Sequence, residues 1–95
     1  MTNRFHPSHD VLAAHLDGEA VLLDLSSKRY FRLNTTGATI WRELEAGRST
    51  QEIADTLVSR FDVDQTMATD AVENLLAELT ERGLLRADDD QAGGA

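Results

Sequence analysis

The fold is decided by one stretch of the chain, Val21–Trp41, which reads VLLDLSSKRYFRLNTTGATIW. Its first residues alternate with the two-residue period of a β-strand, and Ser26–Lys28 is a polar connection of hairpin length. Arg29–Leu33 follows as a further strand that is rich in aromatic residues. After it, apolar residues recur with the period of a helix, which starts at the capping residues Asn34–Thr36. The stretch therefore predicts a β-hairpin that leads into a helix.

The strand Arg29–Leu33 is expected to lie at a sheet edge, because it is the last strand before the helices. Three of the nine basic residues lie in the window Lys28–Arg32. Charged side chains at an edge protect its unpaired backbone groups. The same edge can instead accept an extended peptide as an added strand, and the residues alone leave both interpretations open. Its side chains alternate between two faces, with Phe31 and Leu33 on one and Tyr30 and Arg32 on the other.

Upstream of this hairpin, the sequence predicts one more strand. Val11 and Leu12 begin an apolar run that ends at the turn signal Asp17-Gly18, and Ala20–Leu25 then forms the next strand. Such short connections favour an antiparallel meander, because parallel strands need crossovers of a dozen residues or more. The polar segment before the first strand, Met1–Asp10, is expected to be frayed.

Downstream of the hairpin, two further amphipathic helices are predicted. Ser49 and Glu52 match a capping box, and Ile53–Phe61 has apolar residues at three- and four-residue spacing. Asp64 caps a third helix, Asp64–Arg82, which Gly83 ends in a left-handed cap. The prediction is an α+β fold, a three-stranded antiparallel sheet followed by three helices, which is winged-helix-like in outline.

Length and composition restrict the classes of function. The 95 residues suffice for one domain, predicted over 1–86, followed by an acidic tail, 87–95, that is expected to be disordered. The 9 basic and 17 acidic residues give a net charge of −8, which opposes binding to phosphates and anionic lipid. The chain contains no cysteine, which excludes disulfides and thiol nucleophiles and fits a reducing cytoplasm. No apolar stretch is long enough to span a membrane.

No set of residues predicts catalysis, a metal or a cofactor. His6, His9 and His15 are interpreted as exposed or partly buried histidines, because metal binding needs imidazoles on one face and a further ligand. The serines lack a histidine partner, and the glycines lie at turns and caps and form no phosphate loop. We therefore expect a protein that binds without catalysing a reaction.

DNA binding is the alternative that a winged-helix outline raises. A recognition helix needs basic or amide side chains that reach base edges, together with cations that hold phosphates. The third predicted helix instead has acidic residues against a single arginine, Arg82. Like charges would face the phosphates, so DNA binding is not expected. The acidic residues of this helix are Asp70, Glu73, Glu78 and Glu81.

The stretch Val21–Trp41 closely resembles the PqqD-like family, the leader-peptide recognition elements of ribosomally made and modified peptides. The shared pattern is Leu-Leu-Asp, a short turn, an aromatic pair, and then Leu-Asn-x-Thr-Gly-Ala-x-Ile-Trp. The Ile53–Phe61 helix, the Asp62-Val63 junction and the closing Leu79-x-x-x-Gly83-Leu84-Leu85 also match. The resemblance covers about Val11 to Arg86.

This resemblance implies where a peptide would bind. In the family, the leader of a precursor peptide adds as an antiparallel strand beside the third strand, and its side chains enter a groove against the third helix. On this chain these elements are Lys28–Leu33 and Asp64–Arg82. Helix geometry places Ala68, Val72, Leu75 and Leu79 towards the core, with the groove on one flank. The candidate peptide-binding residues are Lys28, Arg29, Tyr30, Phe31, Arg32, Leu33, Met67, Asp70, Ala71, Asn74, Leu75 and Glu78.

The resemblance also implies partners. The chain is similar both to the B1 proteins of lasso-peptide clusters and to the PqqD proteins of pyrroloquinoline quinone synthesis. A B1 protein would serve a leader peptidase and an asparagine-synthetase-like cyclase, whereas a PqqD protein would serve a radical SAM enzyme. The end of the third strand, Arg29–Asn34, favours the lasso interpretation. A monomer or weak dimer is expected, and a homodimer that uses the same edge is the remaining alternative.

Overall fold

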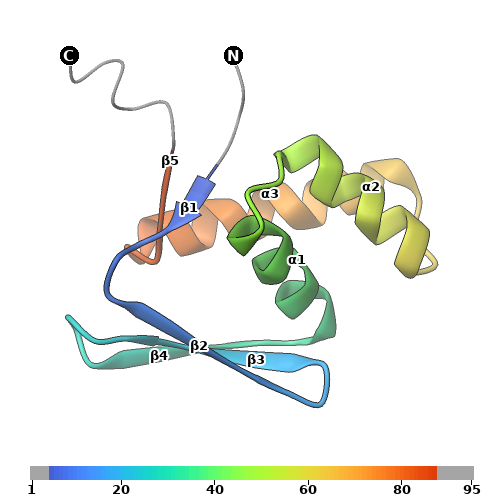
Figure 1. Cartoon of the computed structure of the whole chain (residues 1–95). Coiled ribbons are helices and arrows are strands. Elements are labelled where there is room, and N and C mark those ends of the chain that lie inside the picture. Colours follow the sequence, from blue (N-terminus) through green and yellow to red (C-terminus); the bar gives the residue numbers. More distant parts are fainter. Residues whose placement is uncertain (1–4, 88–95) are drawn as a thin grey trace, which may run out of the picture.

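The computed structural model describes residues 5–87 of the chain and has an α+β fold, as predicted. A three-stranded antiparallel sheet carries the helices on one face, and a short two-stranded ribbon lies beside them (Figure 1). The elements in chain order are β1 Phe5–Pro7, β2 Val11–Leu16, β3 Glu19–Asp24, β4 Arg29–Leu33, α1 Thr35–Glu45, α2 Thr50–Arg60, α3 Gln65–Glu81 and β5 Leu85–Ala87.

The three-stranded sheet is a meander in the order β2-β3-β4. A two-residue turn joins β2 to β3, and both Asp17 (φ 51°) and Gly18 (φ 83°) adopt the positive φ that a type I′ hairpin requires. Leu22 lies opposite Ala13 on one side and Phe31 on the other, and this row faces the helices. The alternation predicted for β4 is confirmed, because Phe31 and Leu33 point inward and Tyr30 and Arg32 point outward.

The predicted helix caps are confirmed. The side chain of Asn34 accepts a hydrogen bond from the backbone N–H of Gly37, and the Asp64 side chain accepts one from Met67. Ser49 and Glu52 form the expected capping box at the start of α2. At the end of α3, Gly83 has a φ of +80°, and the N–H of the next residue donates to the carbonyl of Leu79 at 2.9 Å.

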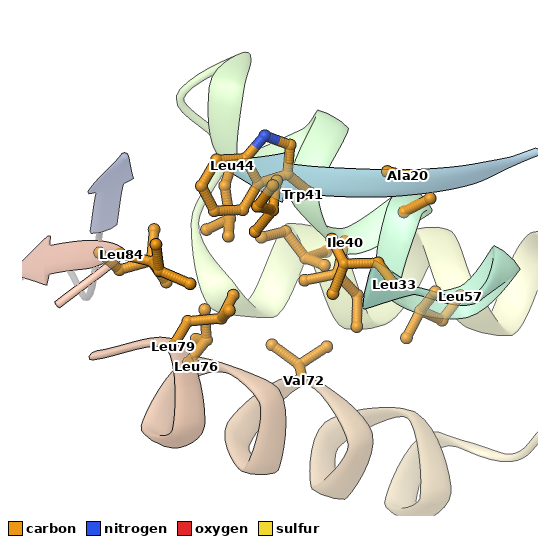
Figure 2. Packing of buried hydrophobic residues seen from close by; sticks show 14 of the residues in the cluster. Ala20, Leu33, Ile40, Trp41, Leu44, Leu57, Val72, Leu76, Leu79 and Leu84 are labelled. Atoms are coloured by element: carbon orange, nitrogen blue, oxygen red, sulfur yellow. The ribbon is translucent and has the colours of Figure 1, made fainter. Parts of the chain in front are cut away.

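The core lies between the inner face of the sheet and the three helices (Figure 2). Trp41 of α1 is 1% exposed, and its indole N–H donates to the carboxylate of Glu45 at 2.9 Å. Phe61, the last residue of the apolar pattern predicted for Ile53–Phe61, is only half-buried and caps the end of α2. The other large side chains that are fully buried are Leu22, Ile40, Leu44, Ile53, Leu57, Leu79 and Val72.

Two details of the prediction are wrong. The N-terminal segment is not frayed at Phe5–Pro7, because β1 pairs antiparallel with β5. Within the core stripe of α3, Leu76 is buried and Leu75 is only half-buried. The reason for the second difference is that Leu76 lies beside Phe5 of β1 and Thr50 of α2, so the core of α3 extends to the side that faces these elements. Strand β5 ends at Ala87, the first residue of the predicted tail, and the rest of that tail lies outside the described residues.

None of the helices in residues 5–87 is both long enough and apolar enough to span a membrane.

Candidate functional site

Strand β4 has an unpaired edge within the described part of the chain. It pairs with β3 on one side, and no strand in residues 5–87 pairs with its other side. The N-terminal segment could have covered this edge, but β1 pairs with β5 instead. Alternate backbone N–H and C=O groups along β4 are therefore available to another extended chain.

The turn before β4 is held by Asp24. Its carboxylate accepts hydrogen bonds from the Ser26 backbone N–H and the Ser27 hydroxyl, both at 3.0 Å. The bond from the Ser27 hydroxyl is the main cause that holds the pKa of Asp24 below its usual value, although some desolvation opposes it. Lys28 closes the turn with a φ of 65°, so it belongs to the turn and not to the strand. These bonds fix where β4 begins.

A hollow of about 430 Å³ lies between the start of β4 and the end of α3. The guanidinium of Arg82 stacks on the ring of Phe31, 4.8 Å from its centroid, and also pairs with Glu78 at 3.3 Å. Two acidic and two basic residues line the hollow, so its charge is balanced. Its lining residues are Asp24, Ser27, Arg29, Tyr30, Phe31, Glu81, Arg82 and Leu84.

The contact between Arg82 and Phe31 shows which flank of α3 faces β4. At about 100° per residue, Ala71, Leu75 and Glu78 lie within about 40° of Arg82 around the helix axis. Ala71 and Leu75 are half-buried. From Arg82 back to Ala71 the helix rises by about 17 Å, the length of about five residues of a strand. Figure 1 shows β4 running in roughly the opposite direction to α3, so a strand added to β4 would follow this flank.

Comparison with known proteins identifies the family of the chain. The family model described as coenzyme PQQ synthesis protein D (PqqD) matches residues 19–85. The chain belongs to the PqqD family. The region that the family model matches begins in β3 and ends at the start of β5, so it includes β4, α3 and the hollow between them.

Two solved structures of leader-peptide complexes are similar to this PqqD-family chain. One is TbiB1 in complex with the TbiA(beta) leader peptide, with 34% identity, a TM-score of 0.81, and coverage of 85% of this chain and 94% of that chain. The other is a lasso peptide synthetase B1 complexed with its leader peptide, with 32% identity, a TM-score of 0.81, and coverage of 87% and 98%. No curated protein gives a significant match.

The structure brings part of the predicted site together. Arg29, Tyr30 and Phe31 line the hollow, and Glu78 reaches it through its ion pair with Arg82. Ala71 and Leu75 lie further along the same flank of α3, flanked by the exposed Met67 and Asn74. Asp70 lies about 120° from Arg82 around the helix axis, so its side chain points away from the groove.

Three predicted strand residues direct their side chains away from this groove, because Tyr30 points outward together with Arg32 and Leu33 points into the core. Leu33 is 4% exposed and belongs to the core, so only its backbone is available. Arg32 points to the opposite face of the sheet, where its guanidinium lies 3.8 Å from the carboxylate of Glu19. The lining residues that the sequence analysis missed are Asp24, Ser27, Glu81, Arg82 and Leu84.

The histidines do not form a metal site within residues 5–87, where no group of three or more potential ligands gathers. His15 instead contacts α1: its Nδ1 accepts a hydrogen bond from Nε of Arg42 at 3.3 Å, and its Nε2 lies 3.9 Å from Glu45. This contact joins β2 to the helix that covers it, which is a structural role.

Proposed function

We propose that this PqqD-family protein is a leader-peptide recognition element. It binds the leader of a ribosomally made precursor as an additional antiparallel strand on β4, in the groove bounded by α3. The observation that carries this proposal is the edge of β4, with which no strand in residues 5–87 pairs, beside a hollow lined by Arg82 and Phe31. Backbone hydrogen bonds would supply affinity, and the hollow would select the side chains that point into it.

The peptide-binding residues that follow from this proposal come from both walls of the groove. On β4 they are the backbone of Arg29–Leu33 and the side chains of Arg29 and Phe31, whereas the Tyr30 side chain points to the opposite face of the sheet. On α3 they are Ala71, Leu75, Glu78 and Arg82, with Met67 and Asn74 at the margin. The turn residues Asp24 and Ser27 complete the end of the hollow.

We further propose that the protein acts in lasso-peptide biosynthesis without catalysing a step itself. Support comes from the two similar structures, both above 30% identity and both bound to leader peptides. By holding the leader, the protein would raise the effective concentration of the precursor at a leader peptidase and an asparagine-synthetase-like cyclase. The description of the family model favours one alternative, a peptide chaperone for a radical SAM enzyme in pyrroloquinoline quinone synthesis.

Calorimetry with synthetic leader peptides tests this proposal. The leader of the precursor encoded beside the gene is expected to bind with a dissociation constant between about 10 nM and 1 μM, which corresponds to about −8 to −11 kcal/mol. A scrambled leader of the same composition is the control and should show no saturable heat. Equal binding of both peptides, or of neither, would contradict the proposal. The neighbouring genes distinguish a peptidase with a cyclase from a radical SAM enzyme.

A further inference from the structure

The face of the sheet that points away from the helices is unusually apolar. Here it is called the outer face, and Figure 1 shows that none of the helices in the described part of the chain covers it. Leu12 is 57% exposed, Leu16 is 65% exposed and Tyr30 is 70% exposed, which is far from the burial that such side chains normally reach. The outer face consists of Leu12, Ala14, Leu16, Val21, Leu23 and Tyr30.

These side chains form one continuous patch across all three strands. Leu12 lies opposite Leu23, which lies opposite Tyr30, and Ala14 lies opposite Val21 in the next outward-facing row. An open hollow of about 660 Å³ runs over them. Glu19 and Arg32 also point outward, and they neutralise each other as an ion pair at the rim. Continuous exposed patches of this kind mark interaction surfaces.

We infer that the outer face binds the leader peptidase that acts on the bound precursor, through a complementary apolar patch on that enzyme. This inference rests on the proposed function and extends it. A leader strand paired with β4 would extend the sheet by one strand. Because side chains alternate along a strand, every second leader residue would then point to the outer face beside Tyr30 and Arg32. An enzyme seated on this face would contact the protein and the leader together.

Two other occupants fit the patch less well. A second copy of the chain would bring together two molecules that each have a net charge of −8, which opposes association. An anionic membrane surface would be repelled by the same charge. The charge of a partner enzyme is independent of the charge of this chain, and its contact with the bound leader would favour binding to the loaded protein.

The test replaces Leu12 and Leu16 together by lysine. Both residues are on β2, the strand furthest from the β4 edge, and both are well exposed, so the domain and its leader groove should be preserved. The matched control is Val58→Lys, which charges an apolar residue that is 37% exposed on α2. Each protein is titrated with the leader peptide and then, loaded with leader, with the leader peptidase from the same gene cluster.

We expect the double lysine variant to bind leader within twofold of the wild type and to bind the enzyme at least tenfold more weakly, whereas Val58→Lys changes neither. The wild type should also bind the enzyme more tightly when leader is present. By linkage, the enzyme should then strengthen leader binding by the same factor. Normal enzyme binding by the double variant would overturn the inference. It would also be overturned if the wild type forms a dimer and the two substitutions dissociate this dimer but leave enzyme binding unchanged. Failure of the proposed function is distinct, because the wild type would then bind no leader.

Discussion

Replacing Ala71 by glutamate is expected to weaken leader binding by at least about thirtyfold, equivalent to about 2 kcal/mol. Ala71 is half-buried on α3 and lies on the flank that Arg82 shows to face β4. A bound peptide would cover this position, so the new carboxylate would lose water without gaining a partner. The small alanine also leaves room for a leader side chain, which glutamate would fill. Titration calorimetry with the leader peptide measures the change.

The matched control for this variant is Ala77→Glu. Ala77 is an exposed alanine on the same helix, but it lies on the other side, in the hollow beside Phe5 of β1. The same charge is added to the same helix there, so leader affinity should stay within about twofold of the wild type. If Ala71→Glu binds leader normally while its circular dichroism spectrum is unchanged, this flank of α3 does not form the groove.

Replacing Trp41 by alanine is expected to lower the free energy of unfolding by about 3 to 5 kcal/mol. Trp41 is the largest fully buried side chain, and it lies where α1 meets the neighbouring elements of the core (Figure 2). The loss is a large share of the roughly 5–15 kcal/mol that stabilises a typical domain. For a chain of this size the melting temperature should fall by roughly 15 °C or more.

Trp41→Phe serves as the comparison for the alanine variant. It keeps an aromatic ring in the core but loses the indole N–H that donates to Glu45. The partner carboxylate is exposed and can bond water, so the loss should be much smaller, about 1–2 kcal/mol. Thermal and urea unfolding measure both variants. A loss below about 1 kcal/mol for Trp41→Ala would contradict the core as described.

Sequence patterns predicted the elements that have strong local signals. Each helix starts at a side chain that can cap it, Asn34, Ser49 or Asp64, and α3 ends at a glycine with positive φ. Hairpins were also predictable, because the Asp17-Gly18 pair suits a type I′ turn. These features depend on residues a few positions apart, so a single sequence contains the information that they need.

The ribbon of β1 and β5 could not be predicted in this way. Each strand has three residues, too few to show a period, and the two are about 80 positions apart. Pro7 also argued against a strand, although proline is tolerated at an edge. Phe5 packs against the core, which helps to hold the ribbon. Long-range pairing of this kind depends on the tertiary structure and not on local propensity.

The site was predictable in outline but not in detail. Local alternation identified Phe31 as inward and Tyr30 as outward, and the family resemblance pointed to α3 as the opposite wall. The helical wheel could not separate Leu75 from Leu76, because adjacent residues straddle the border of the core stripe. Arg82 was missed, although its position four residues after Glu78 on the same flank was visible in the sequence.

The outer face shows a further limit of pattern reasoning. Alternation along β3 separates Val21 and Leu23 from Leu22, but it does not tell which set is buried. The structure buries Leu22 together with Ala20, and it leaves the Val21 and Leu23 side towards solvent. Which set of β3 side chains is buried depends on the inward-facing residues of the neighbouring strands and on the helices that cover them. Exposure of this apolar face was therefore visible only in the folded protein.

A scan of N-methylated leader peptides tests the central claim, strand addition to β4, most directly. N-methylation removes one backbone donor and adds bulk at that position, and it leaves the recognition protein unchanged. If the leader pairs with β4 as an antiparallel strand, affinity should fall about tenfold or more at every second residue, with little change at the residues between. Equal tolerance along the whole segment, or losses that recur every three to four residues as in a bound helix, would contradict the account.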